Sequence, residues 1–240
     1  MDPPLVKAAE HPEILPKESP VAQEWNVIAR VVRRGSVPQW TGSVAMAALF
    51  AAMQRVEPEL ADALHSASPP KPYTISPLIA SGIRDEVRGK YYLEDGSELS
   101  IRVTGIGHAR NVLDALLSRL PRQLMLIDSA VAEVVAIDTT RIVSMGDLLT
   151  EPPPSSTARM RFRTPTAFRR SDGSLQLLPS PEAVFGSISK KWEVLLGQPL
   201  DVEIDTVVVR SYRIRTVPID LAGYRMVGFI GTVDYTFPPE

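Results

Sequence analysis

The sequence predicts an α+β fold of two tandem domains with mainly antiparallel sheets, each sheet carrying its helices on one face. Over residues 24–138 the expected elements run strand, helix, strand, strand, helix, strand, which is the plan of a ferredoxin-like, or RRM-like, domain. A proline-rich segment at 151–156 is typical of a linker between domains. The same order is partly repeated after this segment, and 240 residues are enough for two such domains.

Local patterns support each element of the first half. Alternating apolar and polar side chains predict strands, and leucines at helical spacing from Leu113 to Leu120 predict a helix that Pro121 ends. Asp95-Gly96 favours a tight turn that would join two strands as a hairpin. The expected elements are a strand over 24–34, helices over 41–53 and 58–65, a strand over 73–80, strands over 90–93 and 99–104, a helix between Gly107 and Pro121, and one or two strands within 123–138.

The second half has its own start and turn signals. Ser180 can cap a helix whose first turn holds Pro181, and Asp172-Gly173 favours a second hairpin turn. The expected elements are a strand over 159–163, a hairpin around 171–174, a helix from 180 to about 196, and strands over 202–217 and 224–237. The resulting division is an extended proline-rich lead over 1–20, an N-terminal domain over 21–143, a linker over 144–156 and a C-terminal domain over 157–240.

Composition excludes several classes of protein. The chain has no cysteine, so disulfide frameworks, thiol nucleophiles and zinc sites built on thiolates are excluded. No signal peptide or membrane-spanning run is evident, so we expect a cytoplasmic protein with no membrane partner. A formal net charge of −2 is not typical of a nucleic-acid-binding protein, but many of the basic side chains fall in the second half.

A short stretch between the second helix and the next strand favours proton-transfer chemistry. His65, one of 3 histidines, ends the helix, a proline-braced turn follows, and Lys71 precedes the strand. An imidazole with a pKa of about 6.5 exchanges protons near neutral pH, and an ammonium group can stabilise a neighbouring anion. Taken alone, a histidine at a helix end such as His65 is more often a capping or surface residue, and Lys71 beside prolines is a solvated lysine.

At this point the chain resembles the CRISPR-associated endoribonucleases that cut precursor CRISPR RNA within its repeats, the sixth Cas protein family of the RAMP superfamily. The resemblance rests on motifs in a fixed order. They are Leu64-His65 with Lys71 and the strand at 72–78, the segment at 162–168 with 178–185 and Trp192, and Gly228-Phe229-Ile230-Gly231-Thr232-Val233, which is similar to the family's glycine-rich loop.

The resemblance implies a mechanism without a metal ion or another cofactor. A ribose 2′-hydroxyl attacks the adjacent phosphate, which leaves a 2′,3′-cyclic phosphate and a mature guide RNA. His65 matches the acid or base of this reaction, and Lys71 matches the group that stabilises the phosphate. The implied partners are the precursor repeat RNA and subunits of a CRISPR effector complex, with the protein a monomer or a homodimer. The residues expected to bind RNA are Arg159, Arg161, Arg163, Lys190, Lys191, Arg213, Gly228, Phe229 and Gly231.

One position departs from the family pattern. Some relatives carry a tyrosine on the first helix, where this chain has Phe50. Either Tyr73, Ser66 or Ser68 supplies the missing hydroxyl, or His65 alone moves the proton. The alternative is a non-catalytic RNA-binding RAMP subunit that holds the processed guide in an effector complex.

The expected RNA-binding residues also have plain structural interpretations. Arginines that alternate along a strand share one face, which can simply be a solvated surface. Gly228 and Gly231 can mark a bulge in a buried strand instead of a close approach to RNA. A paired ferredoxin-like protein with a small-molecule or protein partner is a further alternative, and it predicts no salt-dependent RNA binding.

Overall fold

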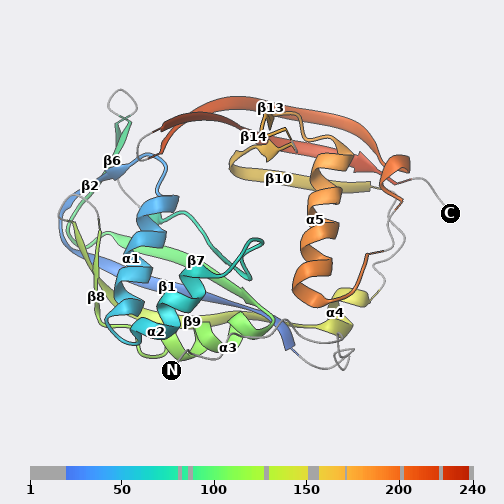
Figure 1. Ribbon diagram of the computed structural model, residues 1–240. Coiled ribbons are helices and arrows are strands. Elements are labelled where there is room, and N and C mark those ends of the chain that lie inside the picture. Colours follow the sequence, from blue (N-terminus) through green and yellow to red (C-terminus); the bar gives the residue numbers. More distant parts are fainter. Residues whose placement is uncertain are drawn as a thin grey trace.

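Two domains lie side by side in the computed structural model (Figure 1). It describes residues 20–80, 83–85, 89–126, 130–150, 157–170, 172–200, 203–221 and 224–237. Most of the predicted lead therefore lies outside the described residues, as does the proline-rich part of the predicted linker.

The N-terminal domain is a six-stranded sheet with helices on one face (Figure 1). Strand order is β3-β7-β1-β9-β8, with β4 also on β7, and the strands of this sheet pair antiparallel to their neighbours. The central place of β1 between β7 and β9 is the arrangement of a ferredoxin-like domain. The elements are β1 (Pro20–Arg33), β2 (Gly35–Pro38), α1 (Gly42–Gln54), α2 (Pro58–Ser66), β3 (Tyr73–Ile75), β4 (Ile79–Ala80), β5 (Ile83–Asp85), β6 (Lys90–Leu93), β7 (Glu98–Ile106), α3 (His108–Leu117), β8 (Gln123–Met125) and β9 (Val131–Ser144).

Alternation along β1 separates the two faces of this sheet. Trp25 and Val27 are buried and join one hydrophobic core with Leu49 of α1 and Leu113 of α3. Burial of such large side chains stabilises the fold by about 1.5–3 kcal/mol each. The period-two and helical patterns predicted from the sequence therefore meet at the same core.

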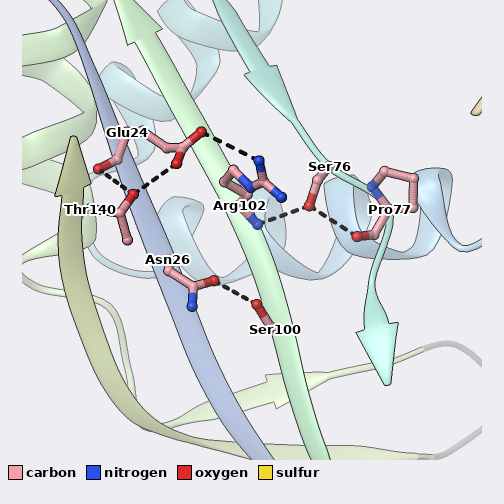
Figure 2. A network of polar contacts seen from close by, with 7 residues as sticks. All are labelled: Glu24, Asn26, Ser76, Pro77, Ser100, Arg102 and Thr140. Atoms are coloured by element: carbon pink, nitrogen blue, oxygen red, sulfur yellow. Dashed lines mark hydrogen bonds and ion pairs between the residues drawn. The ribbon is translucent and has the colours of Figure 1, made fainter. Parts of the chain in front are cut away.

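The opposite face of the sheet carries a polar network (Figure 2). Glu24 on β1 accepts a hydrogen bond from Thr140 on β9 at 2.8 Å and lies 3.7 Å from the guanidinium of Arg102 on β7. The backbone N–H of Arg102 donates to the hydroxyl of Ser76, just after β3, at 2.9 Å. The network thus ties the chain after β3 to the sheet, which sets the place of Tyr73 and its neighbours.

The hairpin predicted around residues 94–97 is wrong in its pairing. The turn itself forms, with φ of 83° at Gly96 and a hydrogen bond from Ser97 N–H to Glu94 O at 3.1 Å. However, β6 pairs with β2 and β5 in a separate sheet, whereas β7 pairs with β1 and β3. The end of β1 takes the place beside β7, because Val31 exchanges backbone hydrogen bonds with Gly96 and Ser97.

The C-terminal domain is a three-stranded sheet of order β10-β14-β13 against a single long helix, α5 (Figure 1). The predicted hairpin around 171–174 is confirmed by the pairing of β11 with β12. Strand, helix, strand, strand are the first four of the six elements of the ferredoxin-like plan, and the remaining helix and strand are absent from the described part of this domain. The elements are β10 (Thr157–Thr166), β11 (Phe168–Arg169), β12 (Leu175–Gln176), α5 (Pro181–Leu196), the short 3-10 helix η2 (Ile204–Thr206), β13 (Val208–Leu221) and β14 (Tyr224–Thr236).

The local signals of this domain act largely as the sequence predicts. The hydroxyl of Ser180 accepts a hydrogen bond from Ala183 N–H at 3.3 Å, so it caps α5 as expected. The first of the two long strands begins later than predicted, because residues 204–206 form η2. Residues 145–149 of the expected linker form a short helix, α4 (Met145–Leu149), which Ser144 and Asp147 close with a capping box.

Candidate functional site

His65 lies at the end of α2 with an exposed side chain. Its ring packs edge-on against Phe50 of α1, with ring centroids 4.9 Å apart and an angle of 70° between the planes. Phe50 is buried, so it forms an apolar support that holds the imidazole without binding its nitrogens. The imidazole faces a hollow, here called the histidine hollow, that is lined by Met46, His65, Lys71, Tyr73, Thr74 and Ile75.

Lys71 closes the end of α2. Its ammonium group donates hydrogen bonds to the backbone carbonyl oxygens of His65 and Ala67. Lysine near a helix C-terminus satisfies carbonyls that have no partner within the helix and interacts favourably with the helix dipole. An ammonium has three protons, so one remains for a substrate. The predicted phosphate-stabilising lysine therefore also holds the backbone of His65.

Of the three residues proposed to supply the missing hydroxyl, Tyr73 is the one that lines the histidine hollow. Its buried ring lies 5.7 Å from that of Phe50, and it lines the histidine hollow. Burial raises the pKa of Tyr73, so the phenol stays protonated and able to donate a hydrogen bond. Of the alternatives, Ser66 donates back to Ala63 O at 3.4 Å, and neither Ser66 nor Ser68 lines the hollow.

The histidine hollow opens into a longer basic furrow. A middle hollow shares Lys71, Tyr73 and Thr74 with it and reaches α5 of the other domain. A groove along α5 and the β11–β12 hairpin shares Pro70 and Lys191 with the middle hollow. Hollows that share wall residues are neighbours, and we call the three together the furrow, which extends from His65 to the C-terminal domain.

Basic side chains dominate the far end of the furrow. The predicted Lys190 and Lys191 are both exposed and line the groove, together with Arg169 and Arg170. Asp172 and Glu182 also line it, but each is engaged locally, by Ser174 and Ser180 respectively, and these hydrogen bonds lower the pKa of both carboxyl groups. Sequence reasoning missed Arg169 and Arg170 as site residues, although paired cations beside a hairpin turn were a usable signal.

Four arginines form a second basic surface on the outer face of the C-terminal sheet. Arg161 and Arg213 both pair in register with Thr232 of β14, so they flank that strand from either side. Arg163 and Arg215 line the same shallow depression, and none of the four has an ion pair with any residue in the described ranges. We call these residues the arginine face. Arg161, Arg163 and Arg213 were predicted; Arg215 was not.

Arg159 differs from the other predicted arginines because it is already paired. Its guanidinium donates two hydrogen bonds to the carboxylate of Asp234, with Nε–Oδ1 at 2.7 Å and Nη2–Oδ2 at 3.1 Å. The pair, with a hydrogen bond from Ser211, lowers the pKa of Asp234 and raises that of Arg159. Alternation along the strand could not distinguish it from Arg161.

The predicted glycine-rich loop is a strand. Gly228, Phe229 and Gly231 all lie inside β14. A Cβ at Gly231, where φ is 140°, would lie 2.1 Å from Arg213 O, and one at Gly228 would lie 2.9 Å from the backbone of Pro165. The glycines therefore allow neighbouring strands to approach closely.

The aromatic ring of Phe229 is part of the core. It is 0% exposed and lies 4.8 Å from the ring of Phe162 and 6.1 Å from that of Phe168. A ring packed on both sides by aromatic neighbours has no face for a base. The Phe229 side chain is therefore closed to RNA, and RNA binding by Gly228, Phe229 and Gly231 stays a prediction for their backbone.

No group of three or more His, Asp or Glu side chains that could hold a metal ion occurs in the described ranges. None of the helices in the same ranges is long and apolar enough to cross a membrane.

Comparison with known proteins supports the resemblance seen in the sequence. Residues 160–239 match the family model of CRISPR-associated endoribonuclease Cas6. Among proteins of curated function, none matches the chain significantly. The resemblance to the Cas6 family is thus confirmed through the C-terminal domain.

Solved structures extend the likeness over both domains. The Cas6 protein TTHB231 of Thermus thermophilus matches with a TM-score of 0.67 and 22% identity, over 92% of this chain and 85% of that chain. A product complex of the Cas6 protein TTHA0078 matches with a TM-score of 0.65 and 21% identity, over 91% of this chain and 84% of that chain. A RAMP protein described as binding different RNA substrates matches with a TM-score of 0.57 and 12% identity, over 90% of this chain and 88% of that chain. These matches confirm the fold class of paired ferredoxin-like domains.

Proposed function

We propose that this protein is a metal-independent endoribonuclease that cleaves precursor CRISPR RNA within its repeats and releases mature guide RNA. The observation that carries the proposal is the histidine hollow, where His65, Lys71 and Tyr73 meet at the start of a basic furrow. The proposal includes a cytoplasmic setting and association with subunits of an effector complex.

The chemistry needs one proton acceptor, one proton donor and stabilisation of the phosphate. The 2′-oxygen forms a bond to phosphorus as the bond to the 5′-oxygen breaks, so the 2′-proton leaves and the 5′-oxygen gains a proton. His65 is the general acid or base of this exchange, which is typically worth about 10²–10⁴ in rate. The remaining proton of Lys71 and the hydroxyl of Tyr73 donate to the phosphate oxygens. One such donor contributes about 3–4 kcal/mol to the transition state.

The RNA is expected to follow positive charge. The furrow leads from His65 past Lys191 to Arg169, Arg170 and Lys190, which supply cations for the phosphates. The arginine face offers a second set of unpaired guanidiniums on the C-terminal sheet. Local charge of this kind attracts RNA although the formal net charge of the chain is −2.

The test is cleavage of the cognate repeat RNA in EDTA by wild type and His65→Ala. We expect wild type to cut at one position and leave a 2′,3′-cyclic phosphate, detected by mass spectrometry. His65→Ala should lower the cleavage rate at least 100-fold, in line with a general acid–base contribution of about 10²–10⁴. His108→Ala, which removes an exposed histidine on α3, is the matched control and should cut normally. Cleavage that requires a divalent ion, or full activity without His65, contradicts the proposal.

One observation favours a second candidate function. Phe50 occupies the place where some relatives carry a tyrosine, and it contacts His65 only through its ring. A RAMP subunit that holds RNA without cutting it would need no hydroxyl there. This candidate predicts salt-dependent repeat binding with no cyclic product.

A further inference from the structure

We propose that the middle hollow of the furrow is a pocket for one unpaired nucleobase, stacked on Trp192, that belongs to a nucleotide adjoining the cut phosphate. The inference rests on the proposed function, because it places the scissile phosphate at His65. It adds a specificity element in which both domains of the chain participate.

The walls of the middle hollow suit a flat aromatic group. The hollow has a volume of about 490 Å³, within the range of small-molecule pockets, which is roughly 300–1,000 Å³. Val21 and Ile106 form one wall, at the ends of β1 and β7, and Trp192 and Leu195 of α5 form the other. Trp192 is only half-buried, so part of its indole remains open. Bases stack on such rings with about 1–3 kcal/mol per base.

The charges around the hollow select a nucleotide over a neutral apolar ligand. Lys71 and Lys191 line it from opposite domains, and no acidic side chain lines it in the described part of the chain. The hydroxyls of Tyr73 and Thr74 add polar groups able to meet the edge of a base. The indole of Trp192, with the ammonium groups of Lys71 and Lys191 in the same walls, therefore matches a nucleobase with its flanking phosphates.

The position of the hollow identifies which nucleotide enters. Lys71, Tyr73 and Thr74 line both the middle hollow and the histidine hollow. A base on Trp192 therefore has its own phosphate within reach of His65. Because unstacking a base costs a few kcal/mol, least for one that is already unpaired, the cut is expected beside an unpaired nucleotide.

The test uses repeat RNA that carries 2-aminopurine in turn at each position. In every probe the 2′-hydroxyl that would attack the scissile phosphate is removed to prevent cleavage. On binding wild type, the fluorescence of the probe adjoining the cut should fall several-fold more than that of remote probes. Trp192→Phe should retain this quenching and Trp192→Leu should lose it. Trp40→Leu, which removes a half-buried indole that lines none of the three hollows, is the control.

A second measurement covers the case in which Trp192→Leu unfolds. Replacing the base at the same position by an abasic site should weaken wild-type binding roughly 5- to 150-fold, the equivalent of losing one stacked base. Equal binding of the abasic RNA, equal quenching by Trp192→Leu, or quenching confined to positions far from the cut would overturn the inference. Position-specific, Trp192-dependent quenching without any cleavage by wild type would instead refute the proposed function alone.

Discussion

Replacing Lys71 by methionine is expected to lower stability and cleavage rate together, because one ammonium group serves both. The group donates to His65 O and Ala67 O at the end of α2. A hydrogen bond to a charged group is worth about 1.5–3 kcal/mol when shielded, and less where solvent screens it. Lys71 is half-buried, so we expect Lys71→Met to cost about 1–3 kcal/mol of unfolding free energy in total. In a chain of this size, each kcal/mol lowers Tm by about 2–4 °C.

The assay combines thermal melts with single-turnover cleavage of repeat RNA. Methionine keeps the apolar stem of the side chain and removes only the charge, so packing changes little. If Lys71 acts only by holding His65 in place, Lys71→Met has no further effect on the residual rate of His65→Ala. If its remaining proton contacts the phosphate, the double variant is slower than His65→Ala alone.

The stabilising role and the catalytic role of Lys71 can be refuted separately. A Lys71→Met protein that melts at the wild-type temperature would show that the ammonium does not stabilise the end of α2. A variant that melts lower but cuts at the wild-type rate would remove Lys71 from catalysis. We expect both quantities to fall, and the double variant to be slower than His65→Ala.

Three further predictions follow from contacts in the C-terminal domain. Gly231→Ala should destabilise by at least about 1–3 kcal/mol in denaturant melts, because its Cβ would lie 2.1 Å from Arg213 O, whereas Gly42→Ala, with nothing within 4 Å, should be tolerated. Burial raises the pKa of Tyr235 to about 12, and its hydroxyl donates to Pro179 O at 2.8 Å. The stability that this phenol contributes is fully present below pH of about 10, its pKa in the unfolded chain, and is lost as pH rises through about 12. Tyr235→Phe should therefore flatten the decline of stability at alkaline pH, measured by circular dichroism. Arg161→Gln should reduce the slope of log binding constant against log salt concentration by roughly 0.7, the value for one phosphate contact on a single strand. Arg159→Gln should change this slope less, because Asp234 already binds that guanidinium. Equal slopes for the two variants would count against the role given to the arginine face.

Signals contained within one segment were predictable, and pairing between segments was not. Ser180 and Pro181 predicted the start of α5 because the cap and the first turn are local. The turn at Gly96 was equally local, and it forms. Which strand lies beside β7 depends on β1, far away in sequence, whose end at Val31 takes the position that a hairpin partner would occupy.

The same distinction applies to the site. His65 and Lys71 are close in sequence, so their meeting could be predicted, although the capping bond from Lys71 to the carbonyl of His65 could not. Arg159 and Arg161 share a strand face, and only the position of Asp234 on β14 separates a paired guanidinium from a free one. Trp192 is half-buried and lines the middle hollow, a position that depends on how α5 meets the N-terminal domain and so could not be predicted from local sequence.

The division of the furrow between domains explains how an acidic chain can present a basic site. The N-terminal domain contributes His65, Lys71 and Tyr73, while α5 and the β11–β12 hairpin contribute the other cations of the furrow. Potential near a surface depends on the charges within about a Debye length, roughly 8–10 Å, and not on the sum over the chain. The furrow gathers its cations from both domains, so neither domain alone carries the complete proposed path for the RNA. Docking of α5 against the ends of β1 and β7 therefore brings the cations of the C-terminal domain beside the proposed catalytic residues.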